Sequence, residues 1–135
     1  MKDVIFDDFQ NSVDESLLRH RSILDIMTKL QESEARINRA VAKTVTNCGC
    51  IEIDSTKQQP KPEEDDIDDI EDLKNFLNPR IKGDLCESCR GVIENEIGNN
   101  LFYLASLCNL LNLNLYDIFL KEYDKIDTLG KYSLR

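Results

Sequence analysis

Residues 86–111 read CESCRGVIENEIGNNLFYLASLCNLL, and this stretch decides the fold. Its apolar residues recur at intervals of three or four, the spacing that places side chains on one stripe of a helix. The spacing therefore predicts one long helix over about 86–111, with Cys108 as a small buried hydrophobe in its interior. The stripe consists of Cys89, Ile93, Ile97, Leu101, Leu104, Cys108 and Leu111.

The same periodicity runs through residues 3–46, upstream of this helix. It predicts either one very long helix or two helices with a break near residues 18–22, where the sequence reads LRHRS. Gly49, inside the tripeptide CGC, ends the pattern, as a residue that tolerates positive φ often does. The apolar stripe comprises Phe6, Phe9, Val13, Leu17, Leu24, Met27, Leu30, Ile37, Val41 and Val45.

A last helix is predicted over about 115–127. Asn114 is a good N-cap for it, and Asp117, three positions later, favours the positive end of the helix dipole. The residues expected to face inward are Leu115, Ile118, Phe119, Tyr123 and Ile126.

The segment between the predicted long helices is polar and acidic. Residues 54–66 read DSTKQQPKPEEDD and contain no apolar side chain, so we expect a flexible acidic loop. Eight of the ten residues 63–72 are acidic, which indicates a solvated connector or, alternatively, an acidic docking or nucleic-acid-mimic surface. The spacing of the apolar residues also predicts a short helix over about 67–77, ended by Pro79.

The composition predicts a single all-α domain over residues 1–135. Five glycines, three prolines and no tryptophan fit helices better than the turn-dense sequence of a small β barrel. A formal net charge of −9 opposes binding to the phosphates of nucleic acid. The N-terminal sequence lacks the pattern of a signal peptide, and no stretch approaches the roughly 18 uninterrupted apolar residues of a membrane span. We therefore expect a soluble cytoplasmic protein with neither a nucleic-acid nor a membrane partner.

Thiols stay reduced in the cytoplasm, so the five cysteines need an explanation other than disulfides. Cys48 and Cys50 close the first helical region, while Cys86 and Cys89 open the helix at 86–111. An antiparallel helix pair would bring these four thiols to the same end. Four sulfur ligands in a tetrahedral array are a preferred structural site for Zn²⁺, so the sequence predicts a structural zinc staple.

Two other interpretations of these cysteines remain open. The first is a redox or disulfide pair, although C-x-x-C in that role usually lies near a βαβ unit, which this sequence lacks. The second is that the thiols are unligated. The C-x-C spacing of the first pair is also rarer in structural zinc sites than C-x-x-C.

Residues 96–126, EIGNNLFYLASLCNLLNLNLYDIFLKEYDKI, resemble the C-terminal half of the MazG-like all-α nucleoside triphosphate pyrophosphohydrolases. In that family the pattern is Glu-Leu-Gly-Asp-Leu-Leu, an apolar helix, a capped turn and a final helix rich in lysine. Residues 30–41, LQESEARINRAV, resemble the family's Leu-Val-Glu-Glu-x-x-Glu-Leu-x-x-Ala helix. Together the two stretches cover about a third of the chain. The resemblance implies a MazG-like antiparallel helical bundle.

The family's active site holds Mg²⁺ between carboxylates of two facing helices, where the ion neutralises phosphate charge and positions water. By this resemblance, Glu32 and Glu96 are candidate ligands. Ser33 and Arg36 stand where the family has two further glutamates, and Asn99 stands where it has an aspartate. Because Arg36 would place a cation in the site itself, we expect Mg²⁺ to bind poorly.

Two further residues complete the candidate nucleotide and Mg²⁺ site. Glu34 restores a carboxylate ligand if the helix register slips, and Lys121 stands where the family often carries a phosphate-binding lysine. The structural alternatives are an i,i+4 ion pair between Glu32 and Arg36 and a solvated face for Lys121.

Two functional hypotheses follow. The first, which we favour, is a non-catalytic or regulatory MazG-like protein that lost its Mg²⁺ ligands and binds a nucleotide or a protein partner. The second is an active metal-dependent pyrophosphohydrolase that uses Glu32, Glu34 and Glu96, with Lys121 toward the phosphates. We also expect a homodimer, because a helix over 3–46 is too long for the shorter helices to cover. Apolar residues over 4–30 are then expected to face the second subunit.

Overall fold

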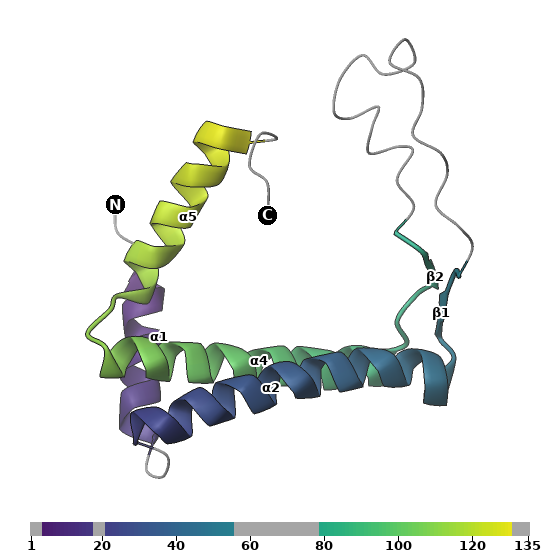
Figure 1. Cartoon of the computed structure of the whole chain (residues 1–135), viewed down its shortest axis with the longest axis horizontal. Helices are drawn as coiled ribbons and strands as arrows, with labels where there is room; N and C mark the ends of the chain where they lie inside the picture. Colours follow the sequence, from purple (N-terminus) through teal and green to yellow (C-terminus); the bar gives the residue numbers. More distant parts are fainter. Residues whose placement is uncertain (1–3, 18–20, 56–78, 131–135) are drawn as a thin grey trace.

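The computed structural model describes residues 4–17, 21–55 and 79–130. The chain is mostly helical (Figure 1), which confirms the predicted helical character, and it adds one small sheet that the sequence analysis does not predict. Among the described residues, no helix combines the length and the hydropathy that crossing a membrane requires. In chain order the elements are α1 (Val4–Ser16), α2 (Ile23–Lys43), the π-helix η1 (Thr44–Cys48), β1 (Ile51–Ile53), β2 (Ile81–Gly83), α4 (Glu87–Leu110) and α5 (Leu115–Leu129).

The centre of the fold is an antiparallel pair formed by α2 and α4 (Figure 1). The buried residues of α2 are Ile26, Ser33 and Ala40, one every seven residues, so they form one seam along the helix. Two of these three side chains are small, which allows the two helices to approach closely. The Asn100 side chain reaches across the seam and donates a hydrogen bond to the Ser33 hydroxyl at 3.0 Å.

Helix α1 crosses the pair at the end where α4 finishes (Figure 1). It ends at Ser16, and α2 begins at Ile23, so the break predicted near residues 18–22 is confirmed. The Ser22 hydroxyl caps α2 by accepting a hydrogen bond from the Leu24 N–H at 3.3 Å. The stripe expected to face a second subunit is therefore partly used within the chain, where Val13 and Ile26 are buried.

Gln10 ties α1 to the turn between α4 and α5. Its side-chain nitrogen donates to Asn109 Oδ1 and to the Leu113 carbonyl, each at 3.0 Å. Its side-chain oxygen accepts from the Leu115 N–H at 2.7 Å. The Asn109 amide in turn donates to the Gln10 carbonyl at 2.9 Å. Gln10 is buried, so this polar network replaces apolar packing at the corner of the molecule.

The far end of the helix pair departs from the predicted pattern. The α-helix expected to reach residue 46 ends at Lys43 and continues as the π-helix η1. Strands β1 and β2 then pair antiparallel, with Ile51 opposite Gly83 and Ile53 opposite Ile81. Strands of three residues are too short to show a periodic signal. The helix predicted over 67–77 and most of the loop predicted over 54–66 lie outside the described residues.

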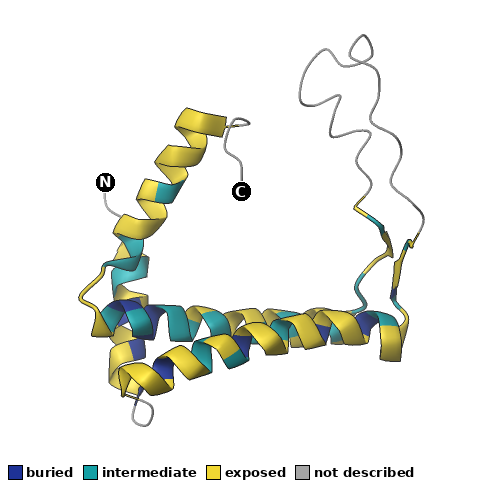
Figure 2. Ribbon diagram, viewed as in Figure 1, coloured by how far each residue is buried: buried dark blue, intermediate teal, exposed yellow. Residues whose placement is uncertain are grey.

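Helix α5 begins as predicted, with the Asn114 side chain accepting a hydrogen bond from the Asp117 N–H at 2.9 Å. The face of α5 that was expected to point inward is covered only in part: Leu115 is half-buried and Phe119 contacts Phe6, but no residue of α5, all of which the structure describes, is buried (Figure 2). The helix leaves the α2–α4 pair, and its main contact within the described part of the chain is with α1, near the start of α5. Cys108, in contrast, is buried in α4 as predicted.

Candidate metal centre

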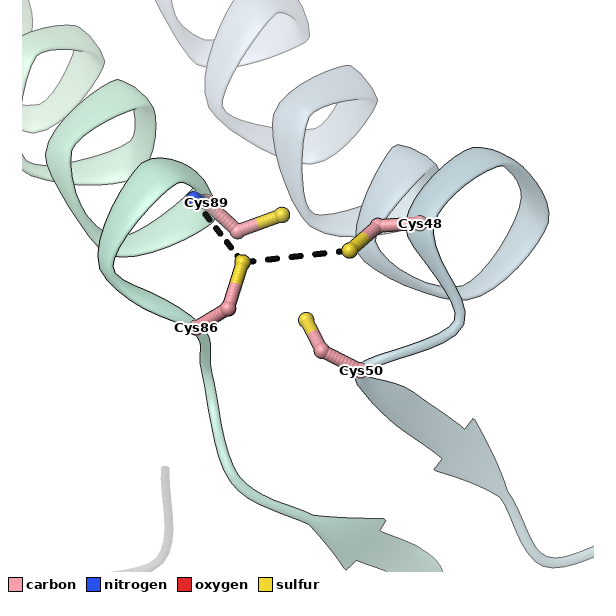
Figure 3. Close-up of side chains that lie close together, drawn as sticks. All are labelled: Cys48, Cys50, Cys86 and Cys89. Atoms are coloured by element: carbon pink, nitrogen blue, oxygen red, sulfur yellow. Dashed lines mark hydrogen bonds between the residues drawn. The ribbon is translucent and has the colours of Figure 1, made fainter.

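Four cysteines converge where α2 and η1 end and α4 begins (Figure 3). The sulfur atoms of Cys48, Cys50, Cys86 and Cys89 all lie within 4.8 Å of one another. The Sγ atoms of Cys48 and Cys86 are 3.8 Å apart. A tetrahedral zinc ion with Zn–S bonds of about 2.3 Å separates its sulfur ligands by about 3.8 Å. The predicted convergence of the four thiols is therefore confirmed, with spacing compatible with a metal ion.

The first pair of thiols is positioned by the end of η1. Cys48 is the last residue of this π-helix, and Gly49 follows with a φ of 80°. The Gly49 N–H donates to the Thr44 carbonyl at 2.8 Å, which turns the chain back sharply. Because glycine adopts this left-handed conformation without a steric penalty, Cys50 is turned to the same side as Cys48 before β1 begins.

The second pair is positioned by the start of α4. Cys86 is the N-cap residue, and its sulfur accepts a hydrogen bond from the Cys89 N–H at 3.4 Å. Cys89 lies one turn further along the helix, so both sulfur atoms point toward Cys48 and Cys50 (Figure 3). The C-x-x-C spacing thus uses a helix N-terminus, where N–H groups stabilise a thiolate.

The electrostatics of the cluster favour one thiolate at a time. The Cys89 N–H, followed by the Cys89 and Cys48 thiols, lowers the pKa of Cys86 to about 7. Hydrogen bonding to Cys86 raises the pKa of Cys89 to about 12. Four thiolates this close together repel one another, so deprotonating all of them requires a nearby cation. The donor set therefore suits a thiophilic metal ion.

The five cysteines are free thiols, and Cys108 stands apart from the cluster. It is buried in α4, where desolvation raises the pKa of its thiol. The carboxylates suggested as Mg²⁺ ligands, Glu32 and Glu96, lie further along the helix pair.

Glu32 and Glu96 face each other across a cavity of about 450 Å³ between α2 and α4, called the charged cavity below. Its other charged lining residues are Arg36, Arg39 and Lys43, all on α2. Oxygen Oε2 of Glu96 is buried and has no hydrogen-bond partner among the described residues. Glu32 and Glu96 thus line one cavity, together with three cations and, within the part of the chain that the structure describes, no third carboxylate.

Arg36 occupies the side of this cavity that the family resemblance assigns to a carboxylate. Its guanidinium lies 3.0 Å from Oε1 of Glu32, and Lys29 lies 3.4 Å from the other carboxylate oxygen. Arg36 and then Lys29 lower the pKa of Glu32 below its ordinary value. The structural alternative, an i,i+4 ion pair, is therefore present in the structure.

The other candidate residues do not line the charged cavity. Asn99 lines a smaller neighbouring cavity of about 210 Å³, which also includes Glu32 and Arg36. Ser33 is buried in the helix seam, where it bonds to Asn100. Glu34 is exposed on α2, and Lys121 is exposed on α5; neither lines either cavity.

Arg39 and Lys43 were not among the candidates from sequence. Arg39 and Lys43 follow Arg36 by three and seven residues, so all three cations lie on one side of α2. This i, i+3, i+7 spacing of basic residues is visible in the sequence. The side chains of Arg39 and Lys43 form no hydrogen bond or ion pair with any other residue in the described ranges.

Comparisons of the chain with protein-family models, with curated proteins and with solved structures find no match.

Proposed function

We propose that this chain is a zinc-stapled helical binding protein, MazG-like in its α2–α4 pair, that holds a nucleotide or another anionic ligand without hydrolysing it. The observation that carries the proposal is the ion pair between Arg36 and Glu32 at 3.0 Å in the charged cavity. A guanidinium in this position repels a divalent cation and takes up one of the carboxylates that would bind it.

The zinc part of the proposal rests on the four sulfur atoms within 4.8 Å of one another. A site built only from cysteine thiolates suits zinc or an iron–sulfur cluster, and a single zinc ion fits the 3.8 Å separation between Cys48 and Cys86. A closed four-sulfur shell leaves no coordination position for water or substrate. The ion would therefore hold the ends of α2 and α4 together without taking part in a reaction.

The ligand part of the proposal rests on the charges that line the cavity. Arg39 and Lys43 are available to an anion, while the buried Glu96 oxygen is available to a hydrogen-bond donor. A nucleotide offers both kinds of group, because its phosphates are anionic and its sugar and base carry donors. The chain as a whole has a net charge of −9, so a concentration of cations at one cavity favours a specific small anion.

Isothermal titration with ATP and GTP in metal-free buffer tests the ligand part. We expect binding by the wild-type protein and a loss of about tenfold in affinity when Arg39→Ala removes one charged hydrogen-bond donor. Arg90→Ala is the matched control, because Arg90 is exposed on α4 and lines neither cavity. Equal losses in the two variants, or no binding by the wild type, would contradict the proposal.

One observation favours the second candidate, a metal-dependent pyrophosphohydrolase. Glu32 and Glu96 line the same cavity from facing helices, and the Glu96 Oε2 atom has no partner among the described residues. Phosphate release from canonical and modified nucleoside triphosphates, with added pyrophosphatase and with Mg²⁺ or Mn²⁺, tests this candidate. We expect no turnover above background. Turnover that Glu96→Gln abolishes would establish the hydrolase and rule out the non-catalytic function.

A further inference from the structure

Helix α5 contacts α1 near its start, through the hydrogen bond from the Leu115 N–H to Gln10 and two aromatic contacts of Phe6. The Phe6 ring centroid lies 5.8 Å from that of Tyr116 and 5.0 Å from that of Phe119. Beyond these contacts α5 extends away from the α2–α4 pair (Figure 1). None of its fifteen residues, all described, is buried (Figure 2). The helix therefore has little tertiary packing against residues 4–17, 21–55 and 79–114.

Apolar side chains are exposed on more than one side of α5. Ile118 and Leu120 lie about 200° apart around the helix axis, and they are 42% and 40% exposed. A helix packed against one neighbour covers a stripe of roughly 100°, so contact with α1 does not account for both sides. The other exposed apolar residues of α5 are Phe119, Tyr123, Ile126 and Leu129.

A helix of this length needs such packing to be stable. Isolated helices shorter than about 12–15 residues are marginal in water, and most helical stability in proteins comes from burial of an apolar face. We propose that a second copy of this chain packs against α5, so that the α5 helices of the two copies form the centre of a homodimer. This inference moves the expected dimer surface from residues 4–30 to the C-terminal helix.

The exposed area matches what a dimer needs. Covering an aromatic side chain fully buries about 150–250 Å², and Phe119 and Tyr123 are 50% and 55% exposed. With four aliphatic side chains of similar exposure, the face offers on the order of 500 Å². Val4 and Ile5, next to Phe6, are each 64% exposed and extend it. If the second copy covers both apolar sides of α5, the two copies together bury at most about 1,000–1,200 Å², which reaches the lower limit for a specific, stable interface.

Charge and symmetry favour a second copy as the occupant. A two-fold axis requires only one self-complementary patch, and α5 supplies one that is apolar over somewhat more than half of its circumference. The polar positions of α5 carry both positive and negative charges, so neither copy presents a surface of one charge to the other. The basic residues are Lys121 and Lys125, and they lie beside the acidic residues Asp117, Asp124 and Asp127. Each chain carries a net charge of −9, so we expect the apolar contact to hold the copies together against a general repulsion.

Sedimentation equilibrium of the full chain tests the proposal. We expect a mass of twice 15.6 kDa for the wild type, and a dimer that becomes tighter as salt screens the repulsion. Ile126→Lys should raise the dimer dissociation constant by about 30-fold or more. Thr128→Lys adds the same charge to the opposite, polar side of α5 and should leave the dimer intact. Circular dichroism of each variant shows whether the α2–α4 pair remains folded.

Three outcomes would overturn the proposal. The first is a wild-type protein that stays monomeric at about 100 μM, because this concentration is far above the Kd of a stable dimer. A dimer that survives Ile126→Lys lies on another surface. A dimer that weakens as salt rises is held by charge pairs rather than by the apolar face.

Discussion

Gly83 ends β2 with a φ of 88°, directly beside the backbone of Cys50. A Cβ atom at this position would overlap the Cys50 carbonyl oxygen. Gly83→Ala should therefore destabilise the protein by about 1–3 kcal/mol, through the left-handed backbone and the displacement of Cys50. Because Cys50 belongs to the four-sulfur cluster, we also expect weaker metal retention, measured by competition with a chromogenic zinc chelator.

Gly98 provides the matched control for this substitution. It lies within α4, and a Cβ atom there would meet no other atom within 4 Å. Gly98→Ala should be neutral or stabilising by up to about 1 kcal/mol, because alanine is the better helix former. Equal stability of the two variants would contradict the role assigned to Gly83.

Gln10 connects three segments through one buried amide. Gln10→Ala removes the partners of the Leu115 N–H, the Asn109 Oδ1 atom and the Leu113 carbonyl, so we expect a loss of about 2–4 kcal/mol in the free energy of unfolding. Urea unfolding followed by circular dichroism measures this loss. Gln31→Ala, on the exposed side of α2, should change stability by less than about 0.5 kcal/mol. A Gln10 variant as stable as this control would show that the network is dispensable.

Glu32 gives the charged cavity a defined response to pH. Arg36 and then Lys29 lower the folded-state pKa of Glu32 below its ordinary value of 4.5. Its contribution to stability is therefore complete above about pH 4.5 and is lost as the pH falls through the lowered pKa. Thermal unfolding across this acidic range should depend less on pH in Glu32→Gln than in the wild type. Parallel pH profiles of the two proteins would exclude a stabilising ion pair.

At the scale of elements, the four cysteines bring the end of η1 and the start of α4 together, next to the paired strands β1 and β2. Cys86→Ser should reduce both metal content and melting temperature, because it removes one ligand and weakens the tie between η1 and α4. Hydrogen exchange should accelerate over residues 44–54 and 80–92 and stay slow at the Gln10 corner. Cys108→Ala is the control, since Cys108 is buried outside the cluster and should leave the metal content unchanged. Uniform exchange changes would contradict a local staple.

The helices were predictable because each carries its own local signal. The periodic stripe of residues 86–111 and the N-cap at Asn114 define α4 and α5, and the polar LRHRS segment marks the end of α1. The π-helix and the paired strands were not predictable, because a change from i+4 to i+5 bonding and a three-residue ladder leave no periodic pattern. Both lie directly beside the four cysteines.

Of the candidate site residues, only the cysteine cluster could be predicted from the sequence and its helix pairing alone. Cys48 and Cys50 precede a turn and Cys86 begins a helix, so an antiparallel pair was enough to infer their convergence. Glu32 and Glu96, which the sequence suggested only through the family resemblance, line the same cavity. Lys121, suggested by the family resemblance, is exposed on α5 and lines neither cavity, because sequence periodicity does not show where α5 lies relative to the α2–α4 pair.

At the scale of the whole molecule, the α2–α4 pair separates two ends with different chemistry. The cysteine cluster lies at one end, and the corner of α1 with α5 lies at the other (Figure 1). The charged cavity lies between them along the pair. This separation means that a metal ion, a small ligand and a second copy of the chain can bind without competing for the same residues.

Native mass spectrometry of the purified protein tests the central claim most directly. If Cys48, Cys50, Cys86 and Cys89 hold a structural zinc ion, each 15.6 kDa chain should carry one zinc, and Cys86→Ser should lose it. A fully reduced chain that contains no metal, takes up none from added zinc and melts at the same temperature with and without chelator would contradict the claim.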